Sequence, residues 1–233
     1  VKFTIQNASS AFQVWDVKDP VNVKQLSNLS SNTDFEFIAP GNQLGEYVVL
    51  AEDDFYEPQL VDNPRLVNQN LHGLTEINYL LITSSDLASE AQRLADYHQT
   101  ENGLTTQVVT VDQIYNEFAS GSPDITAIRD FIKNIYENSR TNPLQHVCFF
   151  GDSSYDYKDR ISNNTNIVPV QLADESFNLA TSYVTDDYFV MLDADEGTMS
   201  VNQDIDVVSS RIPVSTPQEA RVVVDKILSM YNA

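Results

Sequence analysis

The feature that most constrains this fold is a repeated switch between strand-like and helix-like hydrophobic periodicity, which begins at residue 77. Ile77 to Thr83 is a nearly continuous apolar run, as expected of a strand covered on both faces. Behind it, Leu87, Ala91, Leu94 and Ala95 fall on one face of a helix. The pattern predicts a buried strand followed by an amphipathic helix.

The same alternation continues toward the C-terminus. It predicts strands over 105–111 and 146–150, helices over 112–118 and 124–136, a last strand over 205–208 and a last helix that begins at Thr216-Pro217. Strands and helices that alternate with short connections indicate a parallel sheet with right-handed crossovers. We therefore expect an α/β domain over residues 77–233, with helices on both faces of its sheet.

Residues 1–60 follow a different pattern. Their apolar residues alternate with period two between turn residues, which predicts short strands at 1–6, 12–17, 21–27, 34–39 and 46–51. This segment is interpreted as a small, incomplete, sandwich-like β-rich module. The pattern dissolves from Asp53 to Thr75 into acids, amides and the prolines Pro58 and Pro64, and residues 61–76 are expected to form a linker.

Charge and composition exclude several classes of function. The 233 residues carry 34 acidic and 13 basic side chains, a formal net charge of -21, which argues against nucleic acid and anionic membranes as partners. No run approaches the ~20 apolar residues of a membrane span, and no signal peptide is recognisable. Both ends look like cuts within a longer chain; if that chain is exported, its signal peptide is expected upstream of Val1.

Motif searches leave few catalytic candidates. Phosphate-binding glycine loops and the Gly-x-Ser-x-Gly elbow of serine hydrolases are absent from the sequence. Gly151 and Asp152 follow a predicted strand, where open parallel sheets collect ligands and catalytic groups. Cys148 and His146 lie two apart on that strand, so they form either a Cys-His dyad or part of a dry core.

Other polar residues have both a functional and a structural interpretation. His72 either serves a site or caps a surface segment. Asp186, Asp187, Asp193 and Asp195 offer hard oxygen ligands suited to calcium. The alternative for these acids is a solvated loop, and no other cofactor is expected.

The chain resembles the first half of the gingipain-like cysteine peptidase domain. The resemblance rests on Leu80-Leu81-Ile82-Thr83, Val147 to Asp152, Thr185-Asp186-Asp187-Tyr188 and Asp206 to Val214. Within that family it is most similar to the sortases of the type IX secretion system of Bacteroidetes. That similarity is carried by strings at residues 68–73, 113–118 and 127–131, and by Trp15-Asp16-Val17 in the β-rich region.

The resemblance implies a caspase-like fold in two halves, with the nucleophilic Cys and its His base in the second half. It makes Asp206 the acid that orients this His, by the usual logic of a catalytic triad. It further implies an exported enzyme at the outer-membrane surface that removes C-terminal sorting signals from its protein substrates and attaches the cargo to lipopolysaccharide through a thioester. Its partners would be those substrates and other secretion components.

Three interpretations stay open. In the first, the chain is part of that enzyme and is inactive when isolated. In the second, it is a non-catalytic module of the same fold that mediates interactions at the cell surface. An unrelated flavodoxin-like binding domain is a third alternative, which a copurifying cofactor would favour.

Overall fold

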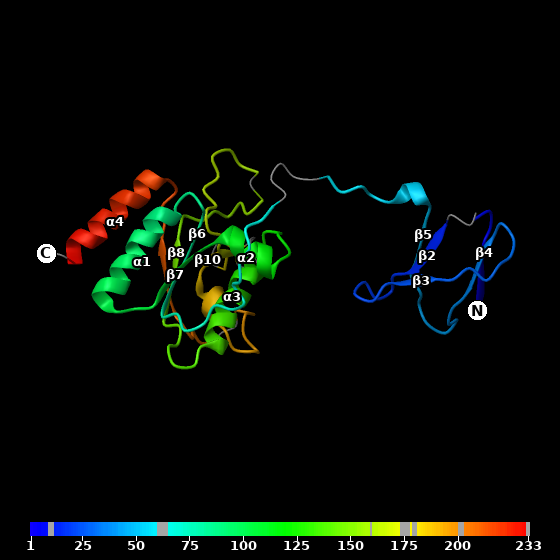
Figure 1. The fold of residues 1–233 in the computed structure, drawn as a ribbon, viewed down its shortest axis with the longest axis horizontal. Coiled ribbons are helices and arrows are strands. Elements are labelled where there is room, and N and C mark those ends of the chain that lie inside the picture. Colours follow the sequence, from blue (N-terminus) through cyan, green and yellow to red (C-terminus); the bar gives the residue numbers. More distant parts are fainter. Residues whose placement is uncertain are drawn as a thin grey trace. The chain divides into compact units, whose positions relative to one another are not determined.

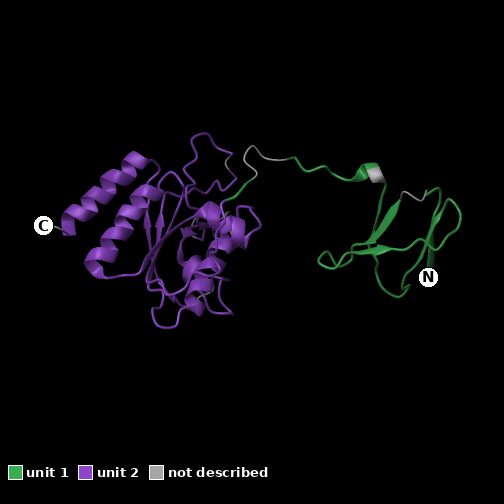
Figure 2. Cartoon of the chain, in the orientation of Figure 1, with its two compact units in different colours: residues 1–66 green, residues 67–233 purple. Residues whose placement is uncertain are grey.

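The computed structural model describes residues 1–8, 12–59, 65–158, 160–172, 178, 181–199 and 203–231. The chain forms two compact units, Val1–Leu66 and Val67–Ala233 (Figure 2). The boundary falls inside the segment expected to be a linker, of which residues 60–64 lie outside the described residues.

Unit 1 is antiparallel. β1 (Lys2–Ile5) pairs with β4 (Phe35–Ile38), and β2 (Gln13–Asp16) pairs with both β3 (Lys24–Leu26) and β5 (Tyr47–Leu50). Each strand lies within one of the five predicted segments. A small core fills the unit, built around the buried side chains of Val14, Phe35 and Phe37.

Unit 2 is built on a four-stranded parallel sheet in the order β11-β8-β6-β7. The strands are β6 (Tyr79–Thr83), β7 (Thr106–Thr110), β8 (His146–Phe150) and β11 (Val208–Ile212). The prediction for the last strand, 205–208, is wrong by three or more residues. The prediction excluded Ser209 and Arg211 because they are polar. In the structure both lie in the sheet, beside Val147 and Phe149.

Helices cover both faces of this sheet (Figure 1). α1 (Ala88–Asn102) and α4 (Pro217–Tyr231) pack on one face, and α2 (Val111–Phe118) and α3 (Ile125–Asn138) pack on the other. The residue types at three helix ends explain why the helices begin or end there. Thr110 and Asp124 accept backbone N–H groups at the starts of α2 and α3, and Gly103 ends α1 with φ 67°.

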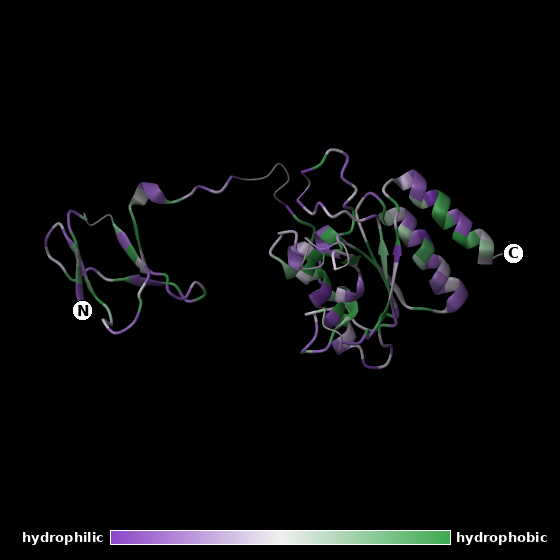
Figure 3. Cartoon of the chain, turned by 180° about the vertical axis from the view of Figure 1, so that it is seen from behind, coloured by the Kyte–Doolittle hydropathy of each residue, from purple (hydrophilic) through white to green (hydrophobic). Residues whose placement is uncertain are grey.

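The inner strands are buried on both sides, which explains their continuous apolar runs. Leu80 and Ile82 pack toward α2 and α3, whereas Tyr79 and Leu81 pack toward α1 and α4. Figure 3 shows hydrophobic strands at the centre of unit 2, between helices in which hydrophobic and hydrophilic stretches alternate. Side-chain direction alternates along a strand, so one run of apolar residues serves two cores.

Residues 67–76 belong to unit 2 and do not form a free linker. Gln69 donates its side-chain amide to Gln113 O at 2.7 Å and to Glu117 at 2.9 Å. The backbone N–H and the ring Nδ1 of His72 each lie 2.8 Å from Glu117 Oε1, and the His72 ring stacks on Phe118 at 4.1 Å. Two of the strings that carried the family resemblance therefore contact each other, and His72 fastens this segment to α2.

The described residues between β8 and β11 form short elements. These are β9 (Gln171–Leu172), β10 (Val184–Thr185), which pairs with β9, and the 3-10 turn η2 (Asp187–Val190). Phe189 and Val190 of η2 are fully buried. Within the described part of the chain, no helix has the length and apolar character needed to cross a bilayer.

The Glu117 contacts predict a pH-dependent stability. Burial opposes ionisation, but the N–H groups of Leu71 and His72 and the Gln69 amide outweigh it and lower the Glu117 pKa from 4.5 to about 2. A depressed carboxyl pKa contributes stability above the unfolded value, and this contribution disappears as the pH falls toward the folded value. Glu117→Gln should therefore destabilise the chain at pH 6, and the difference from wild type should vanish as the pH falls from 4.5 toward 2.

Urea denaturation at several pH values measures this difference. Glu101→Gln is the control, since Glu101 is exposed on α1. A difference for Glu117→Gln that is independent of pH would contradict the assignment.

Candidate functional site

The carboxyl edge of the parallel sheet carries a groove. Two adjoining pockets of about 290 and 420 Å³ share Tyr115, Pro123, Tyr157, Asn166 and Pro169 in their walls. Ser84, which follows β6, and Val111, which follows β7, line the larger pocket. We call this paired hollow the carboxyl-edge groove. Its position is the one at which open parallel sheets bind ligands.

Arg211 organises the chain beside this groove. Its guanidinium forms a bidentate pair with Asp186, at 2.8 Å from Nε and 2.6 Å from Nη2. Nη1 donates to Gly151 O and Val168 O, both at 2.9 Å, and Nη2 donates to Pro169 O at 3.2 Å. All five N–H donors of the guanidinium are thus used. Arg211 holds the end of β8, the 168–169 segment and the start of η2 in one arrangement.

Gly151 and Asp152 lie beside this hub, at the carboxyl end of β8. A Cβ on Gly151 would stand 2.8 Å from Ile167 Cγ2 and 2.9 Å from Val168 Cγ2, so only glycine fits this close approach of two segments. The Asp152 backbone O accepts the N–H groups of Ile167 and Val168 at 3.0 Å. These two residues fold the loop after β8 back over the edge of the sheet.

The expected calcium ligands do not come together. Asp186 is 18% exposed and paired with Arg211, so its carboxylate is already neutralised. Among the described acids, the group whose oxygens approach within 4.8 Å is Asp193, Glu196 and Asp206. The structure does not gather Asp186, Asp187, Asp193 and Asp195 into such a group, and calcium binding by these acids stays a prediction.

Protein groups already engage this acidic cluster. Glu196 accepts the N–H groups of Asp193 at 2.9 Å and Asp204 at 3.0 Å, and these bonds lower the Glu196 pKa, with a further contribution from Arg129. Arg129 also donates to Met191 O at 2.6 and 2.9 Å. The cluster shapes the loop between η2 and β11.

Asp206 lies at the amino edge of the sheet, two residues before β11. Its Oδ2 accepts the Leu192 N–H at 2.6 Å, and its Oδ1 accepts the Tyr136 hydroxyl at 3.3 Å. Gly151 pairs at the far end of the strand with Ile212, so the two positions are separated by roughly 20 Å of extended chain. The assignment of Asp206 as the acid that orients a His stays a prediction, and its contacts here are structural.

Cys148 is a core residue. Its side chain is 1% exposed among residues of α1 and α4, and burial raises the pKa of the thiol despite hydrogen bonds from Tyr79 and Ser210. A protonated, buried thiol is a poor nucleophile. No hydrogen bond joins His146 to Cys148 in the described structure, and the His146 ring instead contacts Tyr79 at 6.2 Å. The geometry favours the dry core over the Cys-His dyad.

Sequence reasoning missed the residues that shape the groove. Tyr115 and Ile125 were assigned to helices, and Tyr157, Asn164 and Asn166 lie in a segment that has no regular period. A signal was present in part, because a loop that follows a buried parallel strand is the expected place for a ligand. Which of its side chains face a cavity depends on how the loop folds back.

Removal of the Arg211 hub should destabilise unit 2. Arg211→Met leaves Asp186 and three carbonyl groups without their donor, and loss of one partner of a buried ion pair costs about 3–5 kcal/mol. The matched control is Arg221→Met, because Arg221 has a side chain that is 70% exposed and a single ion pair with Glu90 at 3.3 Å. Chemical denaturation should show a change within about 1 kcal/mol for the control. Equal losses in both variants would contradict the role of Arg211.

A second pair of variants tests Asp206. Asp206→Ala removes the acceptor of the buried Leu192 N–H and should cost about 1–3 kcal/mol of stability. Asp204→Ala, an exposed neighbour, should have little effect. If Asp206→Ala were as stable as this control and yet abolished peptidase activity in the longer protein, Asp206 would have the role of orienting a His.

Comparison with known proteins places the chain in a family. The model of peptidase family C25 matches residues 72–233. The structure is similar to the crystal structure of dimeric latent PorU from Porphyromonas gingivalis, with a TM-score of 0.79 and 28% identity. The alignment covers 97% of this chain and 22% of that chain, and no curated protein matches significantly. The resemblance and the gingipain-like α/β fold expected from the sequence are confirmed: the chain belongs to peptidase family C25.

Proposed function

We propose that this chain is part of a cysteine peptidase of the sortase type, similar to PorU. The observation that carries the proposal is the extent of the structural likeness. It covers 97% of the chain at 28% identity, whereas the family match begins only at residue 72. The β-rich unit 1 is therefore included in the likeness to PorU.

In this proposal the whole protein is exported and acts at the outer-membrane surface of a bacterium of the Bacteroidetes. It removes the C-terminal sorting signals of proteins secreted by the type IX system and attaches the cargo to lipopolysaccharide through a thioester intermediate. Its partners are these protein substrates and other components of the secretion system. The acidic surface, with a net charge of -21, does not favour nucleic acid as a partner.

The nucleophile and its base lie outside residues 1–233 in this proposal. Cys148 is the one cysteine of the chain, and its burial and raised pKa make it unsuitable. Unit 2 would then supply part of the active site, and residues elsewhere in the protein would supply the thiolate. The chain alone is expected to be inactive.

A non-catalytic module of the same family is the second candidate. The burial of Cys148 favours this candidate, because the described residues contain no exposed thiol beside a histidine. Such a module would use the acidic surface and the carboxyl-edge groove to bind a protein at the cell surface.

Cleavage and transfer of a type IX sorting-signal substrate distinguish the two candidates. We expect activity in the longer protein, none in the 233-residue chain, and unchanged activity in the longer protein with Cys148→Ala. Absence of activity in the longer protein would favour the non-catalytic module. Activity of the isolated chain that is lost with Cys148→Ala would overturn the assignment of Cys148 to the core.

A further inference from the structure

Two tyrosine rings meet toward the C-terminal ends of helices α1 and α4, which lie side by side (Figure 1). The rings of Tyr97 and Tyr231 have centroids 5.4 Å apart and planes inclined by 33°. This separation is within the range of aromatic rings in contact. No other two tyrosine rings of the described structure contact each other. The fold therefore brings one pair of phenols together from two different helices.

Neighbouring contacts hold this pair in place. The His98 ring packs edge-on against both tyrosines, with centroids 5.7 Å from Tyr97 and 6.2 Å from Tyr231. Nearer the N-terminal ends of the same helices, Arg93 of α1 is ion-paired with Asp225 of α4 at 2.6 Å. Contacts at both ends of the helix pair thus keep the two tyrosine rings beside each other in the native fold.

The pair is accessible to solvent, whereas the thiol of the chain is not. Tyr231 is 60% exposed and Tyr97 is half-buried. Desolvation, with Glu101 and Tyr231 nearby, raises the pKa of Tyr97, so its phenol keeps its proton at neutral pH and loses it only together with an electron. Cys148 is the one cysteine and is 1% exposed, so no accessible thiol competes for an oxidant.

We propose that Tyr97 and Tyr231 form an oxidative modification site, at which a haem peroxidase with hydrogen peroxide joins the two phenols in an intramolecular dityrosine. Each phenol loses one electron and one proton and becomes a tyrosyl radical. The radicals form a carbon–carbon bond between ring positions ortho to the oxygens, and the hydrogens at these carbons move to the oxygens to restore both phenols. Hydrogen peroxide accepts the two electrons and two protons and becomes two molecules of water.

The cross-link would tie the end of α4 covalently to α1. Tyr97 and Tyr231 are far apart in the sequence, and a covalent link between distant residues restricts the unfolded chain and stabilises the fold. The modification is independent of the proposed peptidase function, because it uses neither the carboxyl-edge groove nor a catalytic thiol.

Oxidation of the 233-residue chain with a haem peroxidase and hydrogen peroxide tests the proposal. We expect the blue fluorescence of dityrosine in a product of monomeric size, whose mass is lower by that of two hydrogen atoms. Digestion and mass spectrometry should recover the peptides of Tyr97 and Tyr231 joined to each other. The yield should not change on dilution, because both rings belong to one molecule. The cross-linked product should also unfold at a higher urea concentration than the untreated chain.

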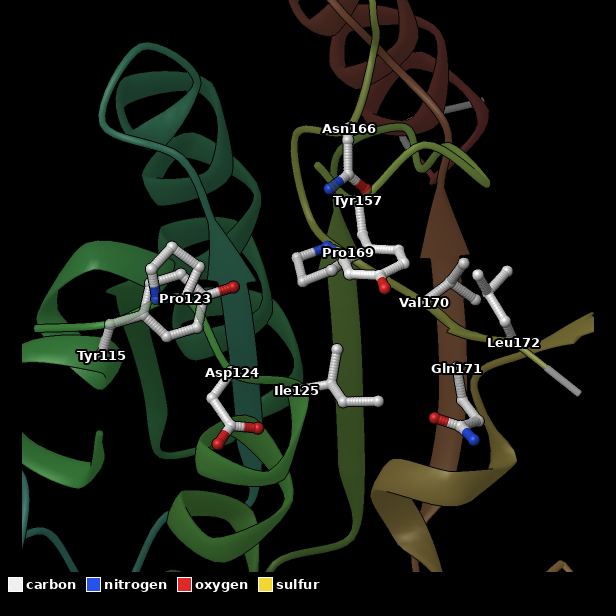
Figure 4. A pocket seen from close by; sticks show the side chains of 10 residues that line it. All are labelled: Tyr115, Pro123, Asp124, Ile125, Tyr157, Asn166, Pro169, Val170, Gln171 and Leu172. Atoms are coloured by element: carbon white, nitrogen blue, oxygen red, sulfur yellow. The ribbon is translucent and has the colours of Figure 1, made fainter. Parts of the chain in front are cut away.

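Tyr231→Phe and Tyr157→Phe are a matched pair of variants. Tyr231 and Tyr157 are 60% and 61% exposed, but Tyr157 lines the carboxyl-edge groove (Figure 4) and has no ring contact with another tyrosine among the described residues. Tyr231→Phe keeps the ring and removes the phenol oxygen, so it should abolish the monomeric product. Tyr157→Phe should form this product as the wild type does.

Three results would overturn the proposal. The first is absence of the joined peptides from the oxidised wild type. The second is an equal yield of monomeric product from Tyr231→Phe and Tyr157→Phe. The third is a cross-link that forms only between molecules and disappears on dilution.

Discussion

The ion pair between Arg211 and Asp186 is the interaction on which the carboxyl edge of unit 2 depends. A guanidinium that is only 14% exposed is stable in that place because every one of its donors has an acceptor. The bonds connect β11, the end of β8 and the segment that continues into Pro169 and Val170, which line the groove. The strings Thr185 to Tyr188 and Asp206 to Val214 share no obvious chemistry in the sequence, but this ion pair joins them into one structural unit.

The two edges of the sheet have different chemistry. At the amino edge, Asp206 and Glu196 receive backbone N–H groups and stabilise a loop. At the carboxyl edge, Tyr115 and Asn164 keep polar atoms without partners beside an apolar hollow. Buried polar groups are normally satisfied, and Asn164 Oδ1 is the exception among the described side chains.

Prediction from sequence succeeded where structure is local. The strand at 146–150 has the predicted bounds, and the helix predicted over 124–136 begins behind the cap residue Asp124. It failed for the strand placed at 205–208. There the polar residues were judged by type, and the strand Val208–Ile212 could not be recognised without the partners that Arg211 finds across the fold.

The sequence by itself determined the α/β class, the order of strands and helices and most of their ends, because hydrophobic period and capping act between residues a few positions apart. Only the tertiary structure decided that Asp186 meets Arg211, that Glu117 holds His72, and that Tyr115 and Tyr157 face one hollow. Those contacts join residues 25 to 45 positions apart and depend on the order of the strands and the path of the loops. No local pattern encodes them.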